Sequence, residues 1–449
     1  MTDTRLSDLT DALLAAAKRA GAEAADAMSI DGQAVSIDVR GGALEQAERA
    51  EGVEIGLRVL IGKRQACVSA SDTSSRTIDD MAERAVAMAR EAPEDPYIGL
   101  ADPDQLARDW DVAALELEDL SPDPAAADLE RDAREAEAAA LAVSGVSQAQ
   151  SASASYSRRR LHLAASNGFS GGYGRSSRSI SVVAISGVGL GMERDWSAES
   201  RIFQADLPDA RSIGTLAGER AVERANPRRP KTGAYPVVFD ERISGSLIGH
   251  LLAAINGTAI ARGASWLRDA MGEQVLPEGL SLIEDPHRAR ISGSRPFDGE
   301  GLPTARRAIV ENGMLKGWTL DLATGRKLGL PSTANAGRGT SAPPSPGAGN
   351  VTLTPGTQTR ADLLAEMGTG LLVTSFIGAT INPTTGDYSR GASGFWVENG
   401  EIRYPVNECT LAGNLRDMLT RIIPANDARP HLSHLVPSLL IEGLTLAGE

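Results

Sequence analysis

The chain is best understood from VVFDERISGSLIGH, residues 237–250. The apolar run at its start predicts a short strand, and the residues after it predict a long helix. Asp240 stands where that helix begins, so its carboxylate can accept hydrogen bonds from the free backbone N–H groups. Apolar side chains then recur at spacings of three and four residues. We therefore expect a strand that leads into a largely buried helix.

One histidine on this predicted helix is the first candidate for chemistry. His250 follows Ser246 by four residues, which puts the two side chains on one face. Zinc hydrolases place two histidines and a glutamate on such a face, because imidazoles one turn apart can bind one ion. No second His, Asp, Glu or Cys stands at the right helical spacing from His250. The residue is therefore either a metal ligand or general base, or a core histidine with satisfied ring nitrogens.

Composition limits the classes of function. The 449 residues carry a net charge of −14, which argues against a nucleic-acid surface because phosphate binding needs clustered Lys and Arg. A local basic cleft is compatible with that total. Two cysteines, Cys67 and Cys409, cannot build a disulfide framework. The start has no leader pattern, and no run reaches the roughly 18 apolar residues of a membrane span. We expect a cytoplasmic protein with no nucleic-acid or membrane partner.

Hydrophobic patterning predicts an α+β fold in three parts. Residues 1–110 open with an amphipathic helix, continue with alternating strands and a hairpin at Gly62, and end with a second helix. Residues 111–226 begin with an Ala-, Glu- and Arg-rich helix and end with another helix. The strands expected between those two helices are 143–157, 160–164 and 180–191. Each of these two parts is predicted to be a small α/β unit.

The third part, residues 232–449, is predicted to be a β-rich domain opened by the strand and buried helix described above. The basic segment 224–231 precedes it, and we interpret this segment as a solvated linker because the whole chain is acidic. Residues 335–350 carry Arg338, three prolines and several glycines. Such a segment is too short for a domain and too stiff for a flexible linker. It is predicted to cover a cleft or to cross the surface in an ordered path.

Other side chains give weaker signals. Ser389 lies in a Gly-rich turn, but the Gly-x-Ser-x-Gly elbow of serine hydrolases is not present. His431 and His434 stand three residues apart without a carboxylate spacing that would complete a metal site. Cys409 is expected to be a small apolar residue in a strand. Neither a P-loop nor a Rossmann fingerprint before a helix occurs.

Several stretches, in this order along nearly the whole chain, resemble the TldD/PmbA family, whose members are also called modulators of DNA gyrase. Each stretch is a weak signal alone, and their order makes the resemblance specific. They are Gly56–Val59 with Gly62–Arg64, Ser166–Phe169 with Ser176–Arg178, Ile243–His250, Gly386–Ser389, Gly394–Glu398 and Leu411–Leu415.

The resemblance implies a heteromeric peptidase. The family has two branches that pair into a cytoplasmic enzyme acting on unfolded or flexible peptides. Its TldD branch carries His-Glu-x-x-x-His on the helix that opens the third domain, and a cysteine ligand nearer the C-terminus. Those helix positions hold Gly245, Ser246 and His250 here, and no cysteine follows Cys409. The resemblance therefore implies a PmbA/TldE-type chain that binds no metal, shapes a peptide-binding cavity and leaves zinc on a TldD-like partner.

Three functions stay open, so the sequence does not decide whether the chain is itself an enzyme. The favoured one is the non-catalytic subunit of a zinc metalloprotease, in which residues near a cleft, His250, Arg338 and Ser389, would meet the peptide. Strand addition to an exposed sheet edge would suit its loose sequence preference. The second is an active metallopeptidase that uses His250 and a further ligand. The third is a non-enzymatic regulator of a DNA-bound target such as gyrase. A homodimer is considered beside the heteromer.

Overall fold

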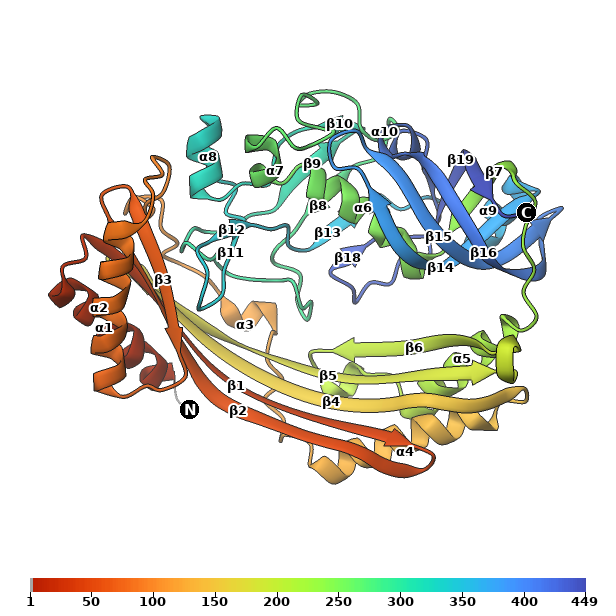
Figure 1. The fold of residues 1–449 in the computed structure, drawn as a ribbon, viewed down its shortest axis with the longest axis horizontal. Helices are drawn as coiled ribbons and strands as arrows, with labels where there is room; N and C mark the ends of the chain where they lie inside the picture. Colours follow the sequence, from red (N-terminus) through yellow and green to blue (C-terminus); the bar gives the residue numbers. More distant parts are fainter. Residues whose placement is uncertain (1–2) are drawn as a thin grey trace.

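The computed structural model describes residues 3–449, and its N-terminal half is built on one long, curved antiparallel sheet (Figure 1). The first and central parts of the chain contribute three strands each. They form one sheet because β1 pairs with β4 along most of its length. The strands lie in the order β3-β2-β1-β4-β5-β6. Their bounds are β1 Ala24–Arg40, β2 Ala43–Ile61, β3 Arg64–Ala70, β4 Val146–Ala165, β5 Ser170–Ser186 and β6 Glu193–Arg201.

Four helices, α1, α2, α4 and α5, cover the outer, convex face of this sheet (Figure 1). Ala25 and Ala27 of β1 pack in one cluster with α1 and α2, whereas Ile37 and Val39 pack in another with α4 and α5. Side chains two residues apart share a face, so the even-numbered residues of β1 face the C-terminal domain. The helical segments are α1 Asp3–Ala20, α2 Ser75–Glu91, α3 Val112–Leu115, α4 Ala126–Ala142, α5 Ala210–Glu223, η1 Gly189–Gly191 and η2 Gln204–Asp206.

The C-terminal domain contains a closed barrel. Its sheet runs β16-β15-β14-β7-β19-β17, and a further pairing between β16 and β19 closes the ring. One apolar cluster joins α6 to this sheet and includes Phe239 and Leu247. The bounds are β7 Gly233–Phe239, α6 Glu241–Ala254, α9 Arg360–Met367, β14 Gly370–Ile381, β15 Asp387–Glu398, β16 Glu401–Asn414, α10 Leu415–Leu419, β17 Ile423–Pro424 and β19 Leu439–Ala447.

A smaller five-stranded sheet in the order β10-β9-β8-β13-β18 and a two-stranded hairpin complete the domain. The hairpin, β11 with β12, lies within the predicted segment 335–350. The remaining bounds are α7 Gly257–Ala261, β8 Leu282–Glu284, β9 Arg307–Glu311, β10 Met314–Leu315, α8 Leu322–Leu328, β11 Ala336–Gly337, β12 Ser345–Pro346, β13 Val351–Leu353 and β18 His434–Leu435.

The β11–β12 hairpin docks on the long sheet through a buried charge cluster. Arg338, between the two strands, forms an ion pair with Asp26 of β1. Arg58 of β2 donates to the same carboxylate at 2.7 Å, and all three side chains are at most 5% exposed. A Cβ on Gly56 would collide with the main chain of Thr340. Segment 335–350 is thus an ordered crossing that joins the C-terminal domain to the N-terminal sheet.

The structure confirms the α+β class, the β-rich C-terminal domain and the strand-to-helix unit at 237–250. Two strand predictions were wrong. Residues 146–157 and 160–164 belong to the single strand β4, because the cluster of arginines between them lies within an unbroken ladder to β1 and β5. The strand predicted to end at 191 ends at Ser186, where Gly187 turns the chain with a φ of 74°. The boundaries 1–110, 111–226 and 232–449 stay a prediction.

The basic segment 224–231 was predicted to be a solvated linker, but the structure shows that it makes specific contacts. Arg224 is only 9% exposed. Arg228 stacks over the ring of Tyr404 at 4.8 Å, and Arg229 forms an ion pair with Glu408. The prediction was wrong because the acidic total of the chain does not reveal which aromatic and acidic side chains lie beside one segment. Among residues 3–449, no helix is long and apolar enough to span a membrane.

The hairpin contact predicts a large stability effect for Asp26→Asn. Burial raises the pKa of Asp26, but Arg338 and Arg58 outweigh it and hold this pKa below its ordinary value. The carboxylate therefore contributes stability above its unfolded-state pKa of 3.8, and this stability is lost as the pH falls through the folded-state pKa. Because Asp26→Asn leaves two buried guanidinium groups unpaired, we expect a loss of about 3–5 kcal/mol in urea unfolding at pH 7.

The matched control is Asp79→Asn, which removes an exposed ion pair with Arg19. We expect a much smaller loss for this variant, because water screens exposed pairs. Equal losses for the two variants would mean that the hairpin contact does not stabilise the fold.

Candidate functional site

The candidate site is built on α6, and its start is as predicted. Asp240 Oδ1 accepts a hydrogen bond from the backbone N–H of Arg242 at 3.1 Å, which confirms the helix cap. Leu247 and its apolar neighbours bury one side of the helix. The other side is open at two positions, because a Cβ built on Gly245 or Gly249 would meet no atom within 4 Å. This open side carries the three positions that the resemblance singled out.

Ser246 and His250 lie on that open side in different environments. Ser246 Oγ donates to Ile243 O at 2.7 Å, so its hydroxyl proton is used within the helix. His250 is half-buried, and its Nε2 is shielded from water without a hydrogen-bond partner among the described residues. Its ring centroid lies 6.0 Å from that of Tyr388. Burial lowers the pKa of His250, and the positive charge of Arg390 lowers it further.

The surroundings of His250 come from β14 and β15. Arg390 Nε donates to Gly378 O at 3.0 Å, and its guanidinium carbon lies 4.2 Å from the centroid of the Phe376 ring. Burial raises the pKa of Tyr388, against an opposing effect of Arg390. The tyrosine therefore stays protonated at neutral pH. The side chains around His250 provide one fixed positive charge and no negative one that acts on its pKa.

These residues do not fit a zinc ion. A zinc site needs at least three protein ligands, and residues 3–449 contain no group of three His, Cys, Asp or Glu side chains that could hold a metal. Beside His250, the guanidinium of Arg390 would repel a cation. Cys409, on β16, donates its Sγ hydrogen to Ala392 O at 3.2 Å. Burial raises the pKa of this thiol to about 11, so it stays protonated and behaves as an apolar strand residue.

The structure places the other two candidate residues apart from each other. Ser389 lies on β15 between Tyr388 and Arg390 and is half-buried. Arg338 lies in the β11–β12 hairpin, is only 1% exposed and lines a cavity on the inner face of the long sheet. Of the two histidines that gave a weaker sequence signal, His431 has its Nε2 3.3 Å from a carboxylate oxygen of Glu199. The roles of His250, Arg338 and Ser389 in peptide binding stay predictions.

Two cavities lie between the inner, concave face of the long sheet and the C-terminal domain. The first, which we name the hairpin cavity, measures about 370 Å³ and is lined by Tyr173 and Arg175 of β5 and by Arg338. The second, the barrel cavity, measures about 620 Å³ and is lined by Val183 and Ile185 of β5 and by residues of β6, β14 and β15. One strand, β5, therefore lines both cavities.

A row of serines lies on the inner face between the two cavities. On β5, Arg175 and Val183 are eight residues apart, which corresponds to about 26 Å along a strand. The inner-face side chains of this stretch and of the neighbouring β4 are short, half-buried hydroxyl groups that can both donate and accept hydrogen bonds. They are Ser153, Ser155, Ser157, Ser177, Ser179 and Ser181. The alternation SASASYS at residues 151–157 was the sequence signal for this surface.

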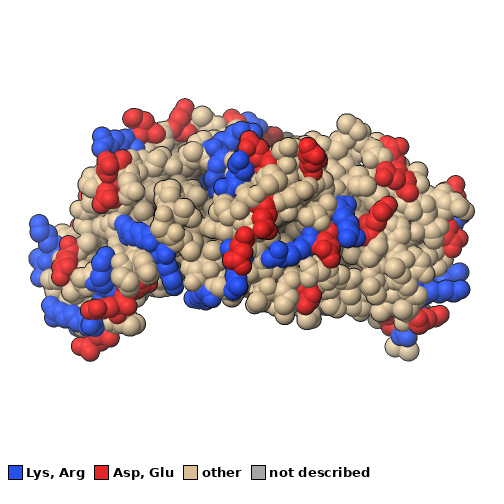
Figure 2. Space-filling view, turned by 90° about the horizontal axis from the view of Figure 1, so that it is seen from above, with Lys and Arg blue, Asp and Glu red and all other residues tan. Residues whose placement is uncertain are grey.

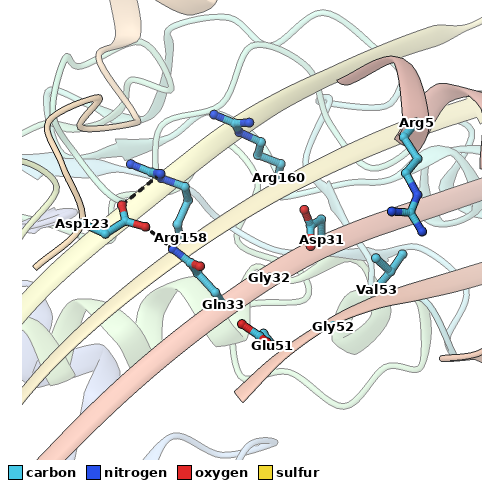
Figure 3. Close-up of a pocket in the computed structure, with 10 residues that line it drawn as sticks. All are labelled: Arg5, Asp31, Gly32, Gln33, Glu51, Gly52, Val53, Asp123, Arg158 and Arg160. Carbon is cyan, nitrogen blue, oxygen red and sulfur yellow. Dashed lines mark hydrogen bonds and ion pairs between the residues drawn. The ribbon is translucent and has the colours of Figure 1, made fainter. Parts of the chain in front are cut away.

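A third cavity, of about 450 Å³, lies on the outer face (Figure 3). Its polar side chains bond to one another across the sheet. Arg158 lies 2.9 Å from Asp123 and 3.2 Å from Glu118, and Arg160 lies 2.8 Å from Glu118. Gln33 also donates to Asp123. These contacts tie the segment before α4 to the sheet, which is a structural role.

The surface charge is mixed on the face that the C-terminal domain presents. Figure 2 shows Lys and Arg interspersed with Asp and Glu there. Nucleic-acid binding by charge would need a continuous basic stripe, and this face offers none.

Comparison with protein-family models gives three matches, in chain order. The description "PmbA/TldA metallopeptidase domain 1" matches residues 25–89, the "central domain" matches 116–226, and the "C-terminal domain" matches 232–448.

Individual proteins are similar over the same length. Metalloprotease PmbA of Escherichia coli O157:H7 is 35% identical over 441 residues, which cover 97% of this chain and 94% of the relative. A solved structure from Bacteroides thetaiotaomicron, called a candidate modulator of DNA gyrase, has a TM-score of 0.92 at 25% identity and covers both chains fully. TldE from Thermococcus kodakarensis shares the fold, with a TM-score of 0.86 at 19% identity over 98% of this chain and all of the other.

The environment of His250 predicts a low titration midpoint. We expect NMR of the imidazole to show a midpoint below the ordinary value of 6.5. The folded protein disfavours the charged ring, so His250 costs no stability above pH 6.5, where the ring is neutral in both states. As the pH falls below 6.5, the unfolded chain binds the proton first and the folded state loses stability. Arg390→Met should raise the midpoint by removing the like charge, and Arg390→Lys should not. A midpoint above 6.5 in the wild-type chain would contradict this geometry.

Proposed function

The chain belongs to the PmbA/TldD metallopeptidase family, and from this membership and the geometry of α6 we propose that it is the PmbA/TldE-type subunit of a zinc peptidase. In this proposal the chain carries no zinc and forms part of the peptide-binding cavity. A TldD-like partner supplies the metal and the catalytic groups. The complex acts in the cytoplasm on unfolded or flexible peptides, as the resemblance implies.

The open side of α6 is the observation that carries the proposal. Zinc-dependent hydrolysis needs an ion held by several ligands and a general base within hydrogen-bond reach of the bound water. Gly245 has no side chain to bind an ion, and the Ser246 hydroxyl is bonded to its own helix. Of these three positions, His250 alone has a side chain that can bind zinc, and Arg390 adds a positive charge beside it. This surface favours a role in peptide binding over a role in zinc-dependent hydrolysis.

The inner face of the long sheet supports the peptide-binding role. The hairpin cavity and the barrel cavity lie at the two ends of one stretch of β5, and a peptide of about eight extended residues would span the distance between them. Several of these hydroxyl groups already bond within the sheet, Ser153 to Asp38, Ser155 to Ser179 and Ser177 to Ser200. Their remaining lone pairs can accept hydrogen bonds from peptide N–H groups of any sequence. This arrangement favours substrates that are extended and loosely specified over folded proteins.

The proposal predicts that the chain purified alone contains far less than one zinc per molecule and cleaves no peptide. The physical reason is that one imidazole beside a guanidinium binds a dication weakly. Elemental analysis after dialysis measures the metal, and a TldD-like chain treated in the same way is the positive control. About one zinc per chain, lost in His250→Ala, would instead mean that His250 belongs to a real metal site and that the chain is an active metallopeptidase.

A further inference from the structure

We propose that the barrel cavity binds the C-terminal residue of a peptide, with an apolar side chain between the walls and a free carboxylate at the polar floor. This inference rests on the proposed peptide-binding function and names the substrate feature that this chain recognises. The cavity volume of about 620 Å³ lies in the range of about 300–1,000 Å³ that is usual for small-ligand sites.

The walls of the cavity are apolar and face one another from two domains. The sheet contributes Trp196 of β6, which is 46% exposed, and the barrel contributes Ile377 of β14, which is 69% exposed. Large apolar side chains this exposed form a surface that a ligand can cover. The other apolar wall residues are Val183, Ile185, Met192 and Phe376. A leucine or phenylalanine side chain would remove several of them from water at once.

The floor of the cavity is polar and organised by one arginine. Arg224, only 9% exposed, follows α5 and reaches across to the barrel. It donates to Ser375 Oγ at 3.0 Å and to Ser393 Oγ at 2.7 Å, and the two hydroxyl oxygens are 2.7 Å apart. It also bonds to Asp195 at 3.4 Å. The side chain that follows α5 and three side chains from β6, β14 and β15 therefore converge on one point.

This floor has donors left for an anion. A guanidinium has more N–H groups than the three bonds that Arg224 makes. Ser375 and Ser393 each accept from Arg224, and only one of them can donate to the other. When Ser393, which is 1% exposed, donates to Ser375, the hydroxyl proton of the half-buried Ser375 can donate to a ligand. Carboxylate oxygens are the acceptors that such a set of donors binds most strongly.

Arg224 and Asp195 of the floor balance each other in charge, and the residues behind them add one positive charge. Asp195 lies between Arg224 and Arg242, at 3.4 and 3.3 Å. Arg242 and Arg360 in turn share Asp240, at 3.1 and 2.6 Å. The connected set thus holds three guanidinium groups and two carboxylates, which leaves one positive charge. On the wall, Glu193 and Arg194 cancel each other.

The edge of β6 does not offer simple strand addition at this cavity. The backbone N–H of Trp196 donates to the Asp195 side chain at 2.7 Å, and its carbonyl accepts from Arg220 at 3.2 Å. An added strand would have to break both bonds. We therefore expect the ligand to be recognised by its terminal carboxylate and side chain.

Fluorescence anisotropy on the full-length chain alone tests the inference. The probes are N-terminally labelled Gly/Ser hexapeptides that end in phenylalanine acid, phenylalanine amide or glycine acid. We expect the phenylalanine acid to bind at least about tenfold more tightly than its amide, because a charge-assisted bond is lost. The glycine acid should also bind more weakly, because the walls stay exposed to water. Unlabelled N-acetylphenylalanine should compete weakly, which would distinguish a peptide terminus from a small apolar acid.

Two variants at the exposed wall avoid disturbing the buried floor. Ile377→Glu adds a negative charge beside the carboxylate and should weaken binding at least about tenfold, and Trp196→Ala should weaken it by removing apolar contact. Leu120→Glu is the matched control, because Leu120 is 78% exposed and does not line the cavity.

Equal binding of the acid and the amide, or unchanged binding in Ile377→Glu, would overturn the inference. Competition by N-acetylphenylalanine as strong as by the peptide would overturn its peptide part. The measurement needs neither zinc nor a partner, so its failure is distinct from a failure of the proposed function, which zinc content and cleavage report.

Discussion

A buried carboxylate between two guanidinium groups is the interaction on which the architecture depends, and two such clusters join the C-terminal domain to the long sheet. Asp26 of the long sheet is held by Arg58 and Arg338, and Asp195 of β6 is held by Arg224 and Arg242. Burying one charge is costly unless it is paired and hydrogen-bonded. In each cluster one arginine comes from the C-terminal domain. The two clusters therefore fix that domain over the concave face of the sheet, and both cavities of that face lie beside them.

In the proposed function, the same chemistry separates this chain from a metalloprotease active site. A metal site concentrates neutral and negative ligands around a cation, whereas the open side of α6 offers glycine, a self-bonded serine and one histidine beside Arg390. The charges of the chain are used to join domains and to line cavities. A protein built in this way can hold a peptide in place and still depend on another subunit to hydrolyse it.

Local features were predictable from the sequence. The strand at 237–239, the Asp240 cap and the buried face of α6 follow from short-range patterns, and the hairpin at Gly62 follows from its turn residues. The closure of the barrel depends on the pairing of β16 with β19, which no local pattern specifies. The barrel cavity was missed for the same reason. Arg224, Asp195, Ser375 and Ser393 are far apart in the sequence, and Arg224 looked like part of a solvated basic segment.

The central claim, that this chain supplies no catalytic group, is tested most directly by removing the His250 imidazole in the assembled complex. The measurement is peptide cleavage by a TldD-like chain mixed with either the wild-type chain or His250→Ala, with complex formation checked by size-exclusion chromatography. If this chain supplies no catalytic group, the variant complex should keep a kcat within about twofold of wild type, because no step of hydrolysis passes through His250, and a lost peptide contact should appear in KM. A loss of about 100-fold or more with an intact complex would contradict the account and place a catalytic residue on this chain.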